Sequence, residues 1–126
     1  MNTTTTASVD ARQQASDISL IVTAVKKLNE FFKDPENAQA YLDHNGWLKE
    51  DGMKKMQEHW TPHALCLSVL CVATEDLDKS PAAMQALNQQ LHEIGAHATP
   101  CQHEKLSGCM SIEATHFYWI GCLKHQ

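Results

Sequence analysis

The stretch Pro62–Glu75, PHALCLSVLCVATE, decides the fold that we predict for this chain. Apolar residues fill every side of a helix drawn through it, whereas a surface helix would keep them on one stripe. A helix of this kind has no side to spare for solvent. We therefore expect it to run through the centre of the domain, with other helices packed around it.

The proline that opens this stretch belongs to a repeated local pattern. Thr61-Pro62 has three counterparts in the chain, which are Asp34-Pro35, Ser80-Pro81 and Thr99-Pro100. In each pair the first side chain can accept a hydrogen bond from a free helical N–H group. The proline lacks the N–H that would stay unpaired at the first helical position. Each pair therefore predicts the start of a helix.

Helical periodicity supports further helices on both sides of these junctions. From residue 17 onward, apolar residues recur at steps of three and four, as in a helix that buries one side. They are Ile18, Ile21, Val25, Leu28 and Phe32. Near the other end, Ser111 is placed to cap a final helix from Ile112 to about Leu123.

These patterns together predict an all-α fold, a compact single-domain bundle of about five to seven short helices. Residues 1–15 are polar with isolated apolar positions, which is typical of a flexible tail. The tail is followed in this prediction by one helical domain over residues 16–126. Neighbouring helices should run antiparallel through tight turns.

Four consecutive large side chains, Phe117, Tyr118, Trp119 and Ile120, suggest a contact surface. On a helix they would sweep about 300° of the circumference, so a single buried stripe could not cover them all. Either the helix is wedged between neighbours or one flank meets another protein, where Tyr and Trp are favoured. Trp47, which follows an Asn-Gly pair on an expected loop, is a second candidate for the same role.

Histidine and cysteine gather in segment 97–109, which contains His97, Cys101, His103 and Cys109. Imidazole and thiolate groups are suitable zinc ligands. The spacing lacks the usual C-x₂-C knuckle, so a polar loop with incidental His and Cys is the competing interpretation. His59 and His63 are four residues apart, but Pro62 between them predicts a corner that separates them.

One cysteine could serve as a nucleophile. Cys101 follows a proline that is expected to begin a helix, where the helix dipole would lower the pKa of its thiol, with His97 and His103 close by. Cys66 and Cys71 lie in the apolar stretch and are interpreted as small core residues. The sequence therefore leaves a Cys101-centred enzyme open as an alternative, although it contains none of the common catalytic motifs.

Charge and composition disfavour several kinds of partner. The formal net charge is −5, and ten basic residues are scattered among fifteen acidic ones. Nucleic acids and anionic membranes are bound by clustered Lys and Arg, so neither is an expected partner. The apolar run Ala64–Ala73 has ten residues, whereas a membrane-spanning helix needs about twenty. No cofactor-binding motif is present, and no cofactor is expected.

Cysteine usage favours a reducing compartment. The chain has five cysteines, an odd number that does not suit a fully paired disulfide framework. Residues 1–14 show no charged segment leading into an apolar one, as an export signal would. The sequence therefore predicts a cytoplasmic protein.

The function predicted by elimination is a small non-enzymatic protein-binding module, such as an adaptor, an immunity-type inhibitor or a secretion-linked accessory protein. Its partner would be another protein or a second copy of the chain. A zinc-binding protein that uses segment 97–109 and a Cys101-dependent enzyme remain the alternatives.

Overall fold

In the computed structural model the backbone is described for residues 2–74, 77, 80–100 and 110–121, and the side chains within these ranges from residue 12 onward. Five helices and four strands make up this part of the chain. In order they are α1 (Asn2–Phe32), α2 (Pro35–Tyr41), β1 (Trp47–Leu48), α3 (Glu50–Glu58), α4 (Ala64–Ala73), α5 (Pro81–His92), β2 (His97–Pro100), β3 (Met110–Glu113) and β4 (Tyr118–Ile120).

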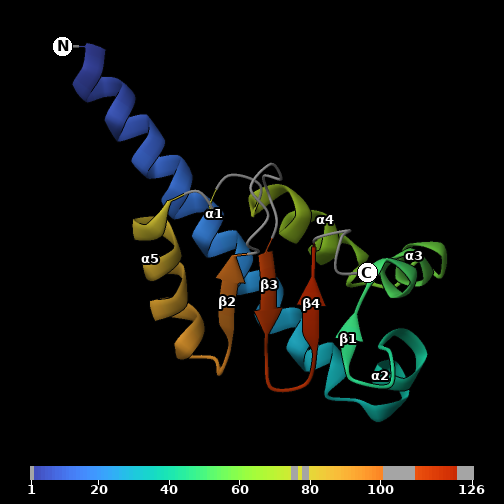
Figure 1. Ribbon diagram of the computed structural model, residues 1–126. Coiled ribbons are helices and arrows are strands. Elements are labelled where there is room, and N and C mark those ends of the chain that lie inside the picture. Colours follow the sequence, from blue (N-terminus) through green and yellow to red (C-terminus); the bar gives the residue numbers. More distant parts are fainter. Residues whose placement is uncertain (1, 75–76, 78–79, 101–109, 122–126) are drawn as a thin grey trace.

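The four strands form one mixed sheet, so the predicted all-α bundle is wrong (Figure 1). Their order is β1-β4-β3-β2; β1 runs parallel to β4, and the other pairs are antiparallel. The helices lie on one face of this sheet and at its sides, with α1 crossing behind the strands. The described chain is therefore a two-layer α/β structure.

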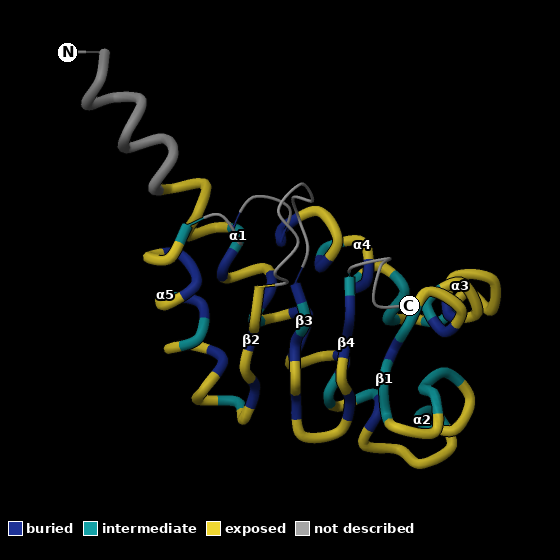
Figure 2. The backbone as a smooth tube through the Cα atoms, in the orientation of Figure 1, coloured by how far each residue is buried: buried dark blue, intermediate teal, exposed yellow. Residues whose placement is uncertain are grey.

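One row of side chains across the sheet shows which face is buried. Ala98, Ile112, Trp119 and Leu48 are register neighbours on the four strands, and none is more than 1% exposed. The indole Nε1 of Trp119 donates to the sulfur of Met53 at 3.4 Å. This face packs against the helical layer, and buried and exposed positions alternate along the strands (Figure 2). The core thus lies between the sheet and α1.

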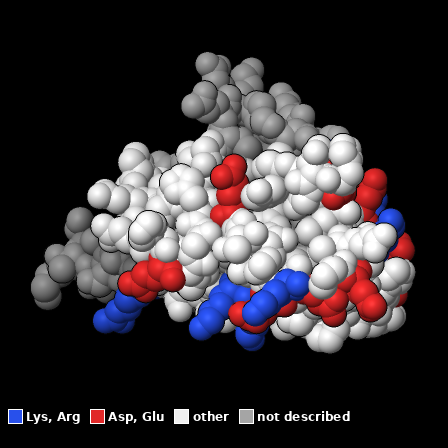
Figure 3. Space-filling view, turned by 90° about the horizontal axis from the view of Figure 1, so that it is seen from below, with Lys and Arg blue, Asp and Glu red and all other residues white. Residues whose placement is uncertain are grey.

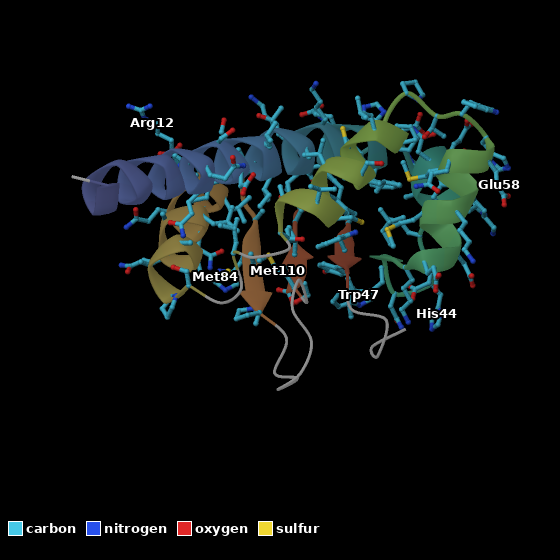
Figure 4. The ribbon with its side chains drawn as sticks, turned by 90° about the horizontal axis from the view of Figure 1, so that it is seen from above. Arg12, His44, Trp47, Glu58, Met84 and Met110 are labelled. Atoms are coloured by element: carbon cyan, nitrogen blue, oxygen red, sulfur yellow. The ribbon has the colours of Figure 1, made fainter. Side chains whose placement is uncertain are left out.

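The central helix is α1, not the helix that follows Pro62. Seen from above, α1 runs along the whole helical side of the molecule, and α4 lies against it (Figure 4). The buried apolar residues of α1 are Ile18, Ile21, Ala24, Val25, Leu28 and Phe32. On α4 only Leu67, Leu70 and Ala73 are buried, whereas Leu65 and Val72 stay exposed. The expected position of α4 at the centre is therefore wrong.

Two of the X-Pro junctions begin helices in the predicted way. Asp34 accepts a hydrogen bond from the N–H of Glu36 at 3.0 Å and caps α2. Ser80 accepts one from the N–H of Ala83 at 3.2 Å and caps α5. Both helices have proline in their first turn, as local capping chemistry predicts.

The other two junctions behave differently. Pro62 lies in a turn before α4, and the N-cap of α4 is His63, which makes no side-chain capping bond. Pro100 ends β2, so the predicted helix start at Thr99-Pro100 is wrong. β2 is an edge strand of the described sheet. A proline there, which has no N–H to donate, costs no hydrogen bond to another strand on the open side.

The predicted final helix over residues 112–123 is also wrong. Residues 110–120 form a hairpin of β3 and β4. Along β3, Met110 and Ile112 are buried, whereas Ser111 is half-buried and Glu113 exposed. This alternation has the period of a strand, and pairing on both sides stabilises it.

The first residues of the chain continue α1 backward to Asn2, and in Figure 1 this end of the helix projects beyond the other elements. The flexibility predicted for residues 1–15 and the single domain predicted for 16–126 stay predictions. Within the described residues, every helix is too short or too polar to cross a membrane.

The turn between α2 and β1 is organised by one carboxylate. Asp43 accepts hydrogen bonds from the N–H groups of Asn45 and Trp47, both at 2.9 Å, and lies 3.6 Å from the ammonium of Lys49. Burial raises the pKa of Asp43, but these backbone bonds and Lys49 outweigh it, and the pKa is lowered overall. Gly46 adopts a φ of 88° in this turn, a left-handed conformation that glycine takes at little cost.

Candidate functional site

An open groove on the described surface lies between α1 and α4. It has a volume of about 460 Å³ and is lined beside the first half of α4 by Leu20, Thr23, Ala24, Lys27, Pro62, His63, Leu65, Cys66 and Val69. A second groove of about 250 Å³ continues beside the last half, lined by Asp17, Leu20, Ser68, Val69, Val72 and Ala73. Leu20 and Val69 line both, so the two grooves form one surface.

Large apolar side chains project around these grooves. Leu65 is 73% exposed, Val72 71% and Leu20 46%. Leu65 and Val72 are seven residues apart, so they lie on one side of α4, about 10 Å from each other along its axis. We call the surface made by Leu20, Leu65, Val69 and Val72 the α4 face. Monomeric proteins rarely expose large contiguous apolar patches, and such patches often mark interaction sites.

The packing of α4 explains why this face is left open. The side that carries Leu67, Leu70 and Ala73 is buried in the core, and Cys66 and Val69 are partly buried against it. Because the remaining residues of α4 apart from Ser68 are also apolar, the rest of the helix presents mainly apolar side chains to solvent. Ala64–Ala73 contains no charged residue. By contrast, charged side chains of both signs gather along the α1 edge in the view from below (Figure 3).

Two charged residues of α1 flank the α4 face at opposite ends. Lys27 lines the groove at the start of α4, and Asp17 lines the groove at its end. This placement shows that α1 and α4 run antiparallel. Asp17 accepts a hydrogen bond from the side-chain amide of Gln13 at 3.0 Å. The face therefore has an apolar middle, a positive end and a negative end.

His63 and Cys66 line the same groove, but they do not form a nucleophilic pair. Burial, together with the charge of Lys27, lowers the pKa of His63, and its Nδ1 has no hydrogen-bond partner among the described atoms. Burial raises the pKa of the Cys66 thiol against the opposing effects of Lys27 and of a backbone hydrogen bond. The thiol stays protonated near neutral pH, whereas a catalytic cysteine needs its thiolate.

The two histidines on either side of the corner have separate neighbours. Nδ1 of His59 lies 3.1 Å from the hydroxyl of Tyr41. The ring of His63 packs against Phe31, with 4.6 Å between ring centroids. Across the described ranges, no group of three or more metal-binding side chains is brought together.

Trp60 stands at the corner between α3 and α4 in an unusual state. Its φ is 54°, a left-handed conformation that large residues rarely adopt, and its side chain is 90% exposed. Next to it in sequence, the hydroxyl of Thr61 is buried without a hydrogen-bond partner among the described atoms. The corner thus presents an indole to solvent beside the start of the α4 face.

The five residues predicted to form an interface do not share one face of the sheet. Phe117 and Trp119 are buried in the core, at 1% and 0% exposure, and Ile120 is 6% exposed. Trp47 and Tyr118 pair across β1 and β4 on the opposite face, with ring centroids 5.3 Å apart. In Figure 4 Trp47 lies on the strand side of the molecule, away from α1. Of the five, only Trp47 and Tyr118 leave part of a ring exposed, and their role in an interface stays a prediction.

Most of the predicted zinc and cysteine chemistry falls where the structure gives no description. His97 is exposed on β2. Cys101, His103 and Cys109 lie outside the described residues, so the zinc site in segment 97–109 and the Cys101 nucleophile stay predictions.

Comparisons with protein-family models, with curated proteins and with solved structures found no match. The α4 face is therefore assigned as the candidate site from its own geometry, burial and charge. The sequence pattern did not reveal this face, because the same apolar residues indicated a helix at the centre of the domain.

Proposed function

We propose that this chain is a small non-enzymatic protein-binding module whose α4 face receives an apolar surface of another polypeptide. One observation carries the proposal: Leu65 and Val72 on the uncharged helix α4 and Leu20 on α1 remain exposed around two grooves. Burying a Leu or Val side chain fully is worth about 1.5–3 kcal/mol. A partner that covers all three would therefore gain enough free energy to make a specific contact.

The shape of the surface favours a helical partner. A groove between two antiparallel helices is the usual receiver for the apolar stripe of a third helix, which contacts it through residues three to four positions apart. Apolar side chains make up more than half of the lining of both grooves, with Lys27 and His63 in the first groove and Asp17 in the second. This lining supports recognition of a protein rather than catalysis.

A cytoplasmic location is part of the proposal. The two cysteines within the described residues, Cys66 and Cys71, are free thiols, and Cys71 is exposed. A reducing compartment keeps such thiols from forming disulfides. A fractionation experiment on the native cells, with the protein found only in the exported fraction, would contradict this part.

The test is a capture experiment from the native cells with two matched variants. Leu65→Glu places a charge on the α4 face at the second residue of α4, and Ala82→Glu places the same charge at the second residue of α5, where the side chain is exposed. We expect a polypeptide held by the wild type and by Ala82→Glu to be lost from Leu65→Glu. Equal retention by all three would contradict the proposal.

A further inference from the structure

We infer that the polypeptide received by the α4 face is a second copy of this chain, bound antiparallel about a two-fold axis that passes near Leu20 and Val69. This inference rests on the proposed function and names its partner. Leu20 and Val69 line both grooves and so mark the middle of the face. A two-fold axis there exchanges the two ends of the face, which is the condition for a closed, self-complementary dimer.

The positions of the projecting side chains satisfy this symmetry. Leu65 stands at the groove beside the first half of α4, and Val72 stands at the groove beside the last half. After a rotation that exchanges the ends, Leu65 of each copy meets the groove that holds Val72 of the other. Each copy thus supplies two projecting side chains and two grooves. Under the same two-fold rotation, each projecting side chain of one copy faces a groove of the other copy.

The charges at the two ends also complement each other. Lys27 belongs to the groove at the start of α4, and Asp17 belongs to the groove at its end. The exchange of ends brings Lys27 of one copy to the same end as Asp17 of the other, and the symmetry makes this contact twice. Within one copy the two residues are ten positions apart on α1, about 15 Å along the helix, so they do not pair with each other.

The number of projecting side chains fits a modest dimer. Each copy offers three exposed large apolar side chains, Leu20, Leu65 and Val72, around its two grooves. Interfaces that bury less than about 600 Å² on each partner are typical of weak association. We therefore expect an equilibrium between monomer and dimer in the micromolar range, rather than a permanent assembly.

Sedimentation of the whole chain over the micromolar range tests the inference. We expect the wild type and the matched control Ala82→Glu to show the same dimerisation. Leu65→Glu should raise the dissociation constant by about 100-fold or more, because the lost burial counts twice in a symmetric dimer. Leu65 is 73% exposed, so circular dichroism should show an unchanged fold in this variant. A wild type that stays monomeric throughout, or a dimer that survives Leu65→Glu, overturns the inference.

Charge reversal tests the antiparallel geometry itself. Lys27→Glu and Asp17→Lys should each raise the dissociation constant by about tenfold, because each places like charges together at both ends. The double variant restores opposite charges and should return to within a few fold of the wild type. A double variant as weak as the single ones overturns the assigned axis.

The two experiments separate failure of the inference from failure of the proposed function. A monomeric wild type that still loses a captured protein through Leu65→Glu overturns the dimer and leaves the binding module standing. A monomeric wild type whose capture is indifferent to Leu65→Glu overturns both.

Discussion

The side chain of Asn88 on α5 bonds to both backbone polar groups of Ala98 on β2. Its Nδ2 donates to the carbonyl oxygen of Ala98 at 3.0 Å, and its Oδ1 accepts from the N–H at 2.7 Å. β2 is an edge of the described sheet, and an open edge offers unpaired groups to other chains. One amide here takes the place of a neighbouring strand, so α5 protects the edge as well as covering it.

Removing that amide should destabilise the protein and open the edge. We expect Asn88→Ala to lower the free energy of unfolding by about 1–3 kcal/mol, because two partly buried backbone groups lose their partner. Urea unfolding measures the loss, and light scattering at raised temperature should show faster aggregation. Gln89→Ala, at the next and exposed position of α5, is the control. Equal stability of the two variants would show that water replaces the amide without cost.

The corner residue Trp60 holds a backbone conformation that favours glycine over other residues. A left-handed backbone costs a residue with a Cβ about 1–2 kcal/mol relative to glycine, and the side chain of Trp60 at 90% exposure contributes almost no burial. We expect Trp60→Gly to be more stable to urea than Trp60→Ala by about 1 kcal/mol. If the alanine variant proved as stable as the glycine variant, the corner would carry no strain at residue 60.

The environment of His63 should make the stability of the protein depend on pH. Burial and Lys27 lower its pKa below the ordinary 6.5, so the folded chain holds fewer protons here than the unfolded chain as the pH falls below 6.5. The contribution of neutral His63 is therefore complete above that pH and is lost on acidification. We expect His63→Gln to flatten the decline in urea midpoint between neutral and mildly acidic pH, whereas His44→Gln, at an exposed loop position, should leave it unchanged. If the urea midpoint declined identically in the wild type and both variants, a group other than His63 would cause the pH dependence.

Features that depend on neighbours in the sequence could be predicted. The starts of α2 and α5 follow from Asp34-Pro35 and Ser80-Pro81, because a cap and a proline act within one turn. The stop after α5 is equally local: Gly95 has a φ of 73°, which glycine adopts at little cost. The apolar stripe of α1 was also readable, since its period is that of a helix buried on one side.

The sheet depends on contacts between distant segments and was missed for that reason. β1 is a strand of two residues that exists only because Trp47 and Leu48 pair with β4, some seventy positions later. The strand period over Met110–Glu113 is visible in the sequence, but four residues are too few to separate a strand from a helix without the partner strand. The same ambiguity affected Phe117–Ile120, whose first three residues alternate between the two faces of the sheet region.

The candidate site was missed because burial is a property of the whole assembly. An apolar helix goes to the centre only when enough elements surround it. Here α1 and the sheet already cover each other, so α4 has a single side left to bury. The same residues that predicted a central helix, such as Leu65 and Val72, became the exposed surface.

Gly52 near the start of α3 should tolerate no side chain. A Cβ there would overlap the carbonyl oxygen of Tyr41, at the end of α2, and would come within 3.0 Å of Leu48. Glycine inside a helix usually costs about 1 kcal/mol relative to alanine, so helix propensity alone predicts that Gly52→Ala stabilises. Overpacking against a backbone atom costs about 1–3 kcal/mol and should win, since α2 and α3 would have to separate. We expect a lower urea midpoint for Gly52→Ala and an unchanged one for Gln57→Ala on the exposed side of α3. A stabilised Gly52→Ala would mean that α2 can move away freely.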